Sequence, residues 1–154
     1  MNTRVVVTGG AGFIGSETIR KLVISGYDVL CFDLAEQIER HKNILSEIGS
    51  LGKLTLAYGS ILDRNSLRDA MNGADVVIHL AAMLGVKKTE DNKLGCIEVN
   101  ITGTDNVLAA AVMHGVKKFV FASSSEVYGE PDTNPIKESQ TTKGKTVYAV
   151  TKIA

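Results

Sequence analysis

Two side chains near residue 150 have the types and spacing of an acid–base pair. Tyr148 and Lys152 lie four residues apart in the segment Tyr148-Ala149-Val150-Thr151-Lys152. Residues four apart share one face of a helix, so the Lys152 ammonium would lie near the phenol and favour its ionised form. Moving a tyrosine pKa from about 10 toward 7 requires about 4 kcal/mol of differential stabilisation. We expect Tyr148 to be a general base whose pKa is lowered by Lys152 together with a second, bound cationic ring in a partly dry site.

A second group of residues has the spacing of a phosphate-binding turn. The segment reads Thr8-Gly9-Gly10-Ala11-Gly12-Phe13-Ile14-Gly15. Gly9 permits a sharp turn, Gly12 lets a pyrophosphate approach the backbone, and Gly15 lets a helix pack closely. The free N–H groups at the helix start, those of Phe13 and Ile14, then face the phosphates. The segment therefore predicts a dinucleotide site.

An acidic residue follows at the distance that a ribose-binding carboxylate requires. Asp33 ends the second apolar run, 18 residues after Gly15. A carboxylate there accepts from a ribose 2′-hydroxyl and repels a 2′-phosphate, which favours NAD over NADP. The alternative interpretation of Asp33 is a turn residue.

The elements that must position these residues alternate between short strands and longer helices. Strands are predicted at 4–8, 28–32, 53–58, 75–80 and 118–122, and helices at 13–25, 35–48, 63–71, 91–114 and from 147 onward. In the first helix, Ile14, Thr18, Ile19, Leu22 and Val23 share one face. Residues 123–146 read as a surface loop. The alternation predicts an α/β fold with a doubly wound, Rossmann-type parallel sheet of five strands, which binds its ligand at the carboxyl ends of the strands.

The spacing Gly9-x-x-Gly12-x-x-Gly15 resembles the extended short-chain dehydrogenase/reductase family, the NAD-dependent nucleotide-sugar epimerases and dehydratases, over the whole chain. The resemblance implies that Leu62 and Asp63 contact adenine, although Asp63 also suits a helix cap. It implies that Ala81 and Ala82 line the cofactor after His79, a residue that we interpret as core. Asn100 resembles a residue of the helix behind the nicotinamide, the alternative being a helix-surface position.

The resemblance also implies a serine and a glutamate beside the base. Counting back from Tyr128 in Ser123-Ser124-Ser125-Glu126-Val127-Tyr128, Ser124 corresponds to the serine that binds the substrate hydroxyl. Ser123 and Ser125 are neighbours that could be mistaken for it. Glu126 resembles the glutamate of sugar dehydratases and sugar-acid decarboxylases, where it could abstract a proton. Its alternatives are a solvated loop residue or a polar substrate contact.

The mechanism implied by the resemblance begins with oxidation at the sugar C4. Tyr148 takes the proton of the 4-hydroxyl while hydride passes to NAD, Ser124 holds the oxygen, and Lys152 grips the nicotinamide ribose. The 4-keto sugar is then epimerised, dehydrated or decarboxylated, and sugar 4-epimerase is our first expectation. A 4,6-dehydratase, a sugar-acid decarboxylase and a truncated, non-catalytic NAD-binding fragment are the alternatives. The expected partners are a UDP-, dTDP- or GDP-linked sugar and, in the full-length protein, a second copy of the chain.

Composition excludes several other classes. The 154 residues carry 17 basic and 17 acidic side chains, which disfavours nucleic-acid and polybasic membrane binding. No signal peptide or apolar span is visible, and no metal-ligand spacing occurs. Cys31 and Cys96 lie in apolar surroundings and read as small hydrophobic residues. We therefore expect a cytoplasmic protein.

The position of the motifs leads to an expectation about the length of the chain. We expect residues 1–154 to be an NAD-binding Rossmann domain truncated just after the Tyr-x-x-x-Lys motif, with the C-terminal substrate domain absent and the sheet incomplete. We expect the fifth strand to present an unpaired edge. Enzymatic activity is thus expected of a longer parent protein.

Overall fold

The computed structural model describes residues 3–154, apart from the side chain of Val86, and these residues form two compact units. Unit 1 comprises residues up to Ala81 together with Thr104–Ala122. Unit 2 comprises Ala82–Gly103 together with Ser123–Ala154.

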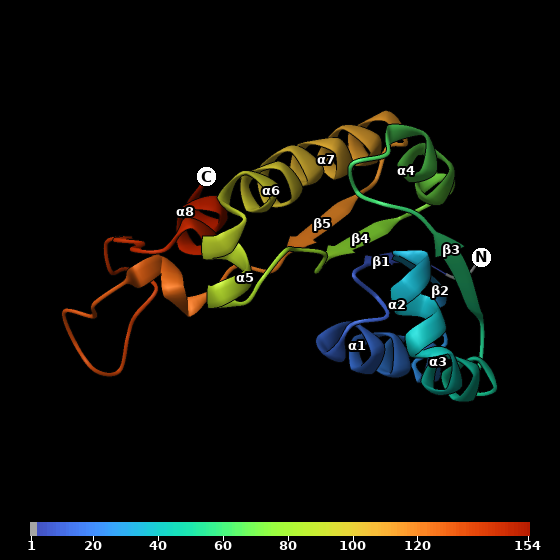
Figure 1. The fold of residues 1–154 in the computed structure, drawn as a ribbon. Coiled ribbons are helices and arrows are strands. Elements are labelled where there is room, and N and C mark those ends of the chain that lie inside the picture. Colours follow the sequence, from blue (N-terminus) through green and yellow to red (C-terminus); the bar gives the residue numbers. More distant parts are fainter. Residues whose placement is uncertain (1–2) are drawn as a thin grey trace. The chain divides into compact units, whose positions relative to one another are not determined.

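Unit 1 is built on a parallel sheet of five strands (Figure 1). The strands are β1 (Arg4–Thr8), β2 (Asp28–Asp33), β3 (Leu54–Tyr58), β4 (Val76–His79) and β5 (Lys118–Phe121). Their order is β3-β2-β1-β4-β5, and all neighbours are parallel. In the register, Thr8 at the end of β1 lies opposite Phe32 and His79. The carboxyl ends of three strands therefore meet at one edge, as predicted.

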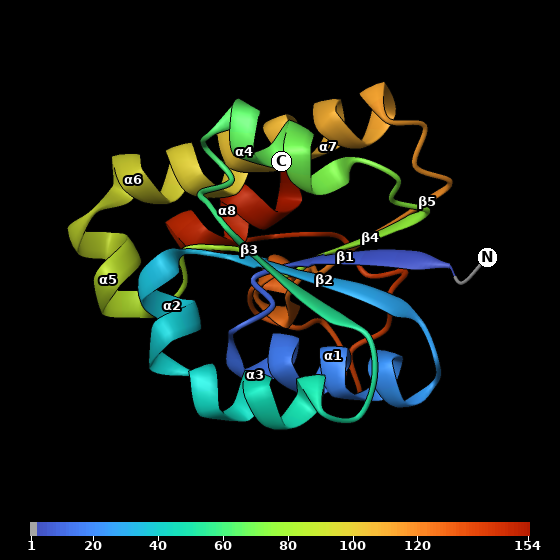
Figure 2. The ribbon, with the colours of Figure 1, turned by 90° about the vertical axis from the view of Figure 1, so that its right-hand side faces the viewer.

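Helices cover both faces of this sheet. They are α1 (Phe13–Ile24), α2 (Ala35–Arg40), α3 (Lys42–Gly49), α4 (Arg64–Met71) and α7 (Gly103–Met113). Helices α1 and α3 lie on one face, and α4 and α7 on the other (Figure 2). The strands are apolar on both sides because both sides are covered. The predicted doubly wound fold is thus confirmed.

The core on the α1 face follows the predicted periodicity of the helices. Ile19 and Val23 of α1 pack with Val5 and Val7 of β1 in one buried cluster. The prediction that Ile14 lies on this buried face is wrong, because 67% of its surface is exposed. It belongs to the first turn of α1, beside the glycine segment rather than over the sheet.

Strand β5 forms an outer edge of the sheet in the described part of the chain, where it pairs with β4 alone. Val120 and Phe121 of this strand are 40% and 37% exposed. The predicted edge is therefore present.

Unit 2 is mainly helical. Its elements are α5 (Val86–Asp91), α6 (Lys93–Ile97), the π-helical turn η1 (Glu98–Thr102), the 3-10 turn η2 (Ser125–Tyr128) and α8 (Val147–Ile153). Helix α8 contacts all four of the others. The predicted helix start at Val147 is confirmed.

Three predicted elements differ from the structure. The helix expected over 35–48 is interrupted at His41, whose backbone leaves the helical region at φ −111° and ψ 16°. The helix expected from Asp91 to His114 begins at Lys93 after the cap Asn92, passes through η1 and ends at Met113. The stretch read as a loop contains η2, and α5 was not predicted.

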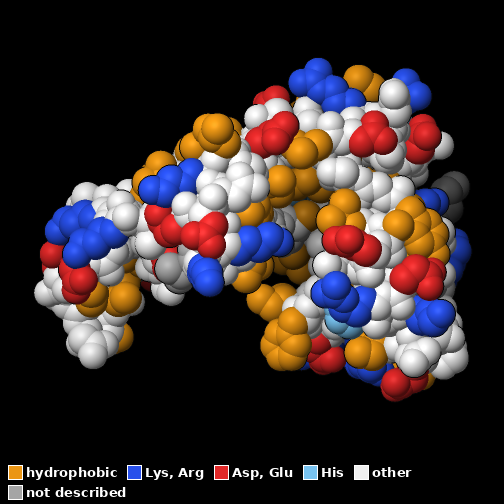
Figure 3. Space-filling view, in the orientation of Figure 1, with side chains coloured by type: hydrophobic (Ala, Val, Ile, Leu, Met, Phe, Trp, Pro, Cys, Tyr) orange, Lys and Arg blue, Asp and Glu red, His pale blue; other side chains and the backbone are white. Residues whose placement is uncertain are grey.

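The surface carries both signs of charge. On the face shown in Figure 3, Lys and Arg side chains are interspersed with Asp and Glu, as the balanced composition predicts. Within residues 3–154, no helix combines the length and apolar character needed to cross a membrane.

Candidate functional site

The glycine loop, Gly9–Gly15, joins β1 to α1 at the carboxyl edge of the unit 1 sheet. Its backbone is fixed by hydrogen bonds from Gly9 N to Phe32 O (2.9 Å) and from Gly12 N to Gly9 O (3.1 Å). Gly9 has a φ of 70°, in the left-handed region that favours glycine. A Cβ there would also lie 2.6 Å from Ala81 N. The sharp turn predicted at Gly9 is therefore present.

Gly12 and Gly15 have different surroundings. A Cβ on Gly15 would overlap the Gly9 carbonyl oxygen and lie 2.8 Å from Gly10 C. A Cβ on Gly12 would meet only Gly9 O, at 3.2 Å. Packing within the chain thus requires glycine more strictly at 15 than at 12. An open backbone at Gly12 is what the close approach of a pyrophosphate requires, so the loop fits a dinucleotide.

Gly10 is a structural residue that the sequence reasoning left without a role. A Cβ there would lie 2.7 Å from Cys31 Sγ and 2.8 Å from Ile19 Cδ1. The loop thus packs directly on the hydrophobic core at Gly10. Cys31 is fully buried, and burial raises the pKa of its thiol to about 12, with a further contribution from the Asp33 charge. Cys31 behaves as the small hydrophobic residue that we predicted.

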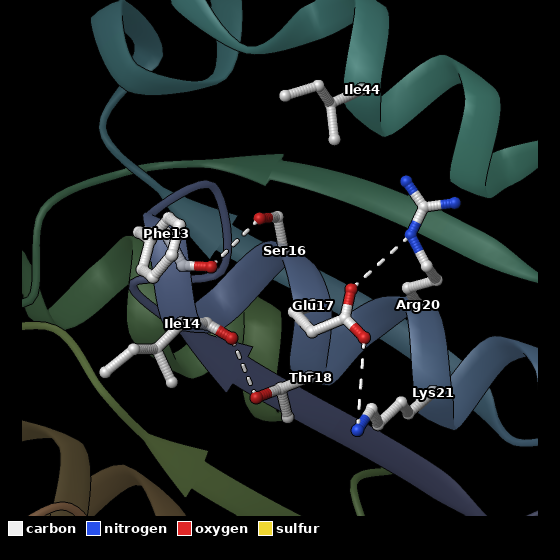
Figure 4. A pocket seen from close by; sticks show the side chains of 8 residues that line it. All are labelled: Phe13, Ile14, Ser16, Glu17, Thr18, Arg20, Lys21 and Ile44. Atoms are coloured by element: carbon white, nitrogen blue, oxygen red, sulfur yellow. Dashed lines mark hydrogen bonds and ion pairs between the residues drawn. The ribbon is translucent and has the colours of Figure 1, made fainter.

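Phe13 and Ile14 begin α1 with exposed side chains, at 96% and 67% exposure. They border a hollow of about 570 Å³ on α1, with Ile44 of α3 across it (Figure 4). Glu17 lies between Arg20 and Lys21 on the same face and forms ion pairs with both (Figure 4). The hollow shares Phe13 and Ile14 with the predicted dinucleotide site but includes neither Gly12 nor Asp33 in its lining.

Asp33 ties the end of β2 to the glycine loop. Its Oδ2 accepts from Ala11 N at 3.0 Å and its Oδ1 from Leu34 N at 2.8 Å. Burial raises the pKa of Asp33 above its ordinary value of 3.8, while the two backbone hydrogen bonds and the charge of His41 oppose this shift. The bond to Leu34 is local, but the bond to Ala11 is tertiary. Asp33 is therefore more than a turn residue.

Asp63 is the N-cap of α4. Its carboxylate accepts from Asn65 N at 3.0 Å and from the Ser66 hydroxyl. The Ser66 bond, followed by the Asn65 bond, lowers the pKa of Asp63. The cap interpretation is confirmed, and the adenine contact of Asp63 and of half-buried Leu62 stays a prediction.

The end of β4 holds the predicted core histidine. His79 is fully buried, with its Nδ1 2.6 Å from Thr8 Oγ1 and its Nε2 3.0 Å from Thr104 Oγ1. Both ring nitrogens are therefore satisfied within unit 1. Ala81 lies two residues after His79, and its backbone packs against Gly9. Ala82 is the first residue of unit 2.

Unit 2 brings together the predicted Ser–Tyr–Lys group, Ser124, Tyr148 and Lys152. Lys152 Nζ lies 5.9 Å from the centroid of the Tyr148 ring, and the Ser124 side chain lowers the pKa of the Tyr148 phenol against the effect of burial. Lys152 is only 8% exposed. Burial lowers the pKa of its ammonium below 10.5, against an opposing contribution from Cys96.

Within the chain alone, the pKa of the Tyr148 phenol is raised above 10.0 rather than lowered. Burial is the main cause, the charges of Glu126 and Cys96 add to it, and Ser124 opposes it. The Lys152 ammonium lies over the ring face, and the predicted lowering of the pKa requires a second positive charge as well.

Glu126 lies in η2, and its side chain is not a freely solvated one. Thr146 Oγ1 donates to Glu126 Oε2 at 2.9 Å, and Glu126 N donates to Ser124 Oγ at 3.2 Å. The backbone of Glu126 is thus tied to Ser124 and its carboxylate to Thr146, the residue that caps the helix carrying Tyr148.

Asn100 is buried, so its interpretation as a helix-surface residue is wrong. At 4% exposure it accepts from Met83 N (2.7 Å) and donates to Met83 O (3.0 Å) and to Thr151 Oγ1 (3.0 Å). Thr151 in turn donates to Tyr148 O at 2.7 Å. Asn100 therefore fixes the segment after β4 and the helix that carries Tyr148.

Sequence reasoning missed Thr146, the N-cap of α8. Its Oγ1 accepts from Ala149 N at 3.0 Å, in addition to the bond to Glu126. The signal was available, because threonine directly before an apolar helical run is a common N-cap. Its link to Glu126 joins residues 20 apart and has no local signal.

Comparisons with known proteins agree on one family. The family model described as "NAD dependent epimerase/dehydratase family" matches residues 5–154. A UDP-N-acetyl-alpha-D-glucosaminuronate decarboxylase of Bacillus cytotoxicus is 41% identical over 160 residues, covering 99% of this chain and 47% of that protein. A UDP-glucose 4-epimerase of Bacillus subtilis is 36% identical, covering 97% of this chain and 44% of that protein.

A solved structure shows the same fold. The UDP-glucose-4-epimerase of Stenotrophomonas maltophila, crystallised with NAD and formylated UDP-arabinopyranose, superposes with a TM-score of 0.85. It is 33% identical, and the match covers 99% of this chain and 46% of that one. The chain thus spans about half the length of the relatives that it matches.

Proposed function

Because the chain belongs to the NAD dependent epimerase/dehydratase family, we propose that it provides the NAD-binding and catalytic residues of an enzyme that acts on nucleotide sugars through a 4-keto intermediate. Sugar 4-epimerase is the first candidate. The relatives are about twice as long, which supports assigning residues 1–154 to the NAD-binding part and the main substrate contacts to a further domain. NAD as the expected cofactor is confirmed at the level of the family.

The cofactor residues are supported by the fit of the glycine loop. The open backbone at Gly12 and the helix start at Phe13 and Ile14 would receive the pyrophosphate. The Asp33 carboxylate would accept from a ribose hydroxyl and repel a 2′-phosphate. Bound there, NAD supplies a hydride acceptor and a positively charged ring.

The observation that carries the catalytic proposal is the buried Lys152 ammonium, which lies 5.9 Å from the centroid of the Tyr148 ring, with the Ser124 side chain acting on the same phenol. Tyr148 would take the proton of the sugar 4-hydroxyl, and Ser124 would orient that oxygen. The phenol needs additional positive charge to ionise near neutral pH, because burial and Glu126 raise its pKa. A cation beside the phenol acts in the required direction.

The test is Tyr148→Phe, assayed for NAD binding by calorimetry and for turnover of UDP-glucose. Loss of a general base costs about 10²–10⁴-fold in rate, while NAD affinity is expected to stay unchanged. Tyr27→Phe is the control, since Tyr27 lies outside both groups, between α1 and β2, and is 38% exposed. Normal turnover by the Tyr148 variant would falsify the assignment of the base.

A second candidate, decarboxylation of a nucleotide-linked sugar acid, is supported by Glu126. Its backbone is tied to Ser124, its carboxylate is tied to Thr146, and its charge acts on the Tyr148 phenol. The 41% identical relative is named as a decarboxylase. A 4,6-dehydratase would use the same carboxylate as a base. Product analysis separates the three, since they yield an inverted C4 centre, carbon dioxide or a 4-keto-6-deoxy sugar.

We also propose that the chain pairs with a second copy. Two exposed apolar residues, Leu108 and Val112, lie four positions apart on α7. Residues at this spacing share one face of a helix, and an exposed apolar face suits packing against another helix. The nucleotide is proposed to be UDP, because the relatives named above act on UDP-sugars.

A further inference from the structure

The hydroxyl of Thr146 makes two hydrogen bonds of different kinds. It accepts from Ala149 N at 3.0 Å, which caps α8. It also donates its proton to Glu126 Oε2 at 2.9 Å. A hydroxyl has one proton and two lone pairs, so the two bonds are compatible. The cap needs only the acceptor, so the donated proton is available for a second role.

That proton is directed at a carboxylate that would otherwise be free to turn. Glu126 lies on a four-residue 3-10 turn and is exposed. An exposed glutamate samples several rotamers, and holding one of them requires a specific contact. Among residues 3–154, Thr146 supplies the hydroxyl that holds this carboxylate.

The held carboxylate acts on Tyr148. After burial, Glu126 is the largest influence that raises the pKa of the phenol. The other ionisable groups around the start of α8 are Cys96 of α6, Glu90 of α5, whose Oε1 accepts from Val147 N at 3.4 Å, and Lys152 of α8 itself. Glu98 of η1 is exposed. The position of Glu126 is therefore the one that depends on Thr146.

We propose that Thr146 is a positioning residue that ties Glu126 to the first turn of α8 and so holds this carboxylate at the start of the helix that carries Tyr148. The inference rests on the proposed function, in which Tyr148 is the base. It adds that Thr146 sets the pH at which this base ionises and the direction from which Glu126 can reach a substrate.

The experiment is a titration of Tyr148 in the 154-residue chain, followed by ¹³C NMR of tyrosine Cζ and assigned with Tyr148→Phe. The variants are Thr146→Val, Thr146→Ser, Glu126→Gln and Thr146→Val/Glu126→Gln. Glu126→Gln is expected to lower the midpoint by about one pH unit, and Thr146→Val by about half a unit. Thr146→Ser keeps both bonds and should titrate like the original protein.

The double variant separates positioning from capping. Loss of the cap alone would expose Tyr148 and shift its midpoint equally with Glu or Gln at position 126. Loss of positioning gives no further shift once Glu126 is neutral. An unchanged midpoint in Thr146→Val, or an equal shift in both backgrounds, overturns the proposal. A crystal structure of Thr146→Val gives a second readout, in which Glu126 is expected to turn away from α8 and retention of its place would also overturn the proposal.

The titration requires neither NAD nor a sugar. A protein without turnover can therefore still show the predicted shifts, and an active enzyme can fail to show them. Circular dichroism of each variant establishes that the compared chains are folded.

Discussion

At the scale of single residues, Gly12 and Gly15 show how one motif combines two physical requirements. Gly15 is glycine because a side chain would overlap the Gly9 carbonyl. At Gly12 an added Cβ would lie 3.2 Å from Gly9 O, a tight contact but a milder one than the overlap at Gly15. The Gly12 φ of −71° and ψ of 174° are also open to alanine. The fold therefore requires glycine more strictly at 15 than at 12, where we propose that the ligand adds to the requirement.

This difference predicts opposite outcomes for two matched substitutions. Gly15→Ala should lower the free energy of unfolding by about 1–3 kcal/mol, because overpacking forces the loop to shift. Gly12→Ala should leave it within about 1 kcal/mol yet weaken NAD binding about tenfold or more. Urea unfolding and calorimetry check the two effects. Unimpaired NAD binding by Gly12→Ala would remove the argument that this backbone faces a pyrophosphate.

Spacing predicted that Tyr148 and Lys152 share a helix face, and the family resemblance added Ser124, but neither predicted the electrostatics of Tyr148. The helical interval correctly placed Lys152 on the face of Tyr148. The pKa of the phenol depends also on its burial and on Glu126, 22 residues earlier in the chain. The burial of Asn100 likewise follows from Met83 and Thr151, which no local pattern connects to it.

At the scale of elements, the start of α4 depends on an ionised side chain. Hydrogen bonds from Ser66 and Asn65 lower the pKa of Asp63 below 3.8. The ionised carboxylate therefore stabilises the fold. Its contribution is complete above pH 3.8 and is lost as the pH falls through the lower value of the folded state.

We accordingly expect Asp63→Ala to lower the thermal unfolding midpoint at pH 7. The difference from the original protein should shrink as the pH falls below 3.8. Asp63→Asn keeps a capping oxygen and should retain most of the stability both at pH 7 and below pH 3.8. A pH-independent difference for the alanine variant would contradict the cap argument. Weaker NAD binding by the asparagine variant at unchanged stability would support the adenine contact.

Strands and helix interiors were predictable, and interruptions within helices were not. Residues 35–48 kept their helical period across His41, because Leu45 N still donates to His41 O at 3.1 Å. Ile38, Leu45 and Ile48 are therefore buried as one helix would bury them. The helix changes to the π-helical turn η1 around Asn100, whose side chain is hydrogen-bonded to Met83 and Thr151. Tertiary hydrogen bonds of this kind override local pattern.

At the scale of the whole molecule, the exposed apolar residues Leu108 and Val112 of α7 predict self-association. Val112 is 81% exposed, and an exposed apolar side chain gains from burial against a partner helix. Val112→Asp should convert a dimer into a monomer in light scattering after gel filtration. Ile24→Asp is the matched control, on α1 and 64% exposed. A dimer that survives the Val112 change would place the interface elsewhere.

The division of the chain into two discontinuous units has a consequence for biosynthesis. Strands β1, β2 and β3 pair among the first 58 residues, so the glycine loop and Asp33 have their partners early in translation. The chain then leaves unit 1 for residues 82–103 and returns to complete the sheet with β5. The bond between Asn100 and Thr151 closes only when α8 has emerged. Vectorial synthesis thus assembles the cofactor-side framework before the helix of the base, and the exposed intermediates in between are the stage at which chaperones would act.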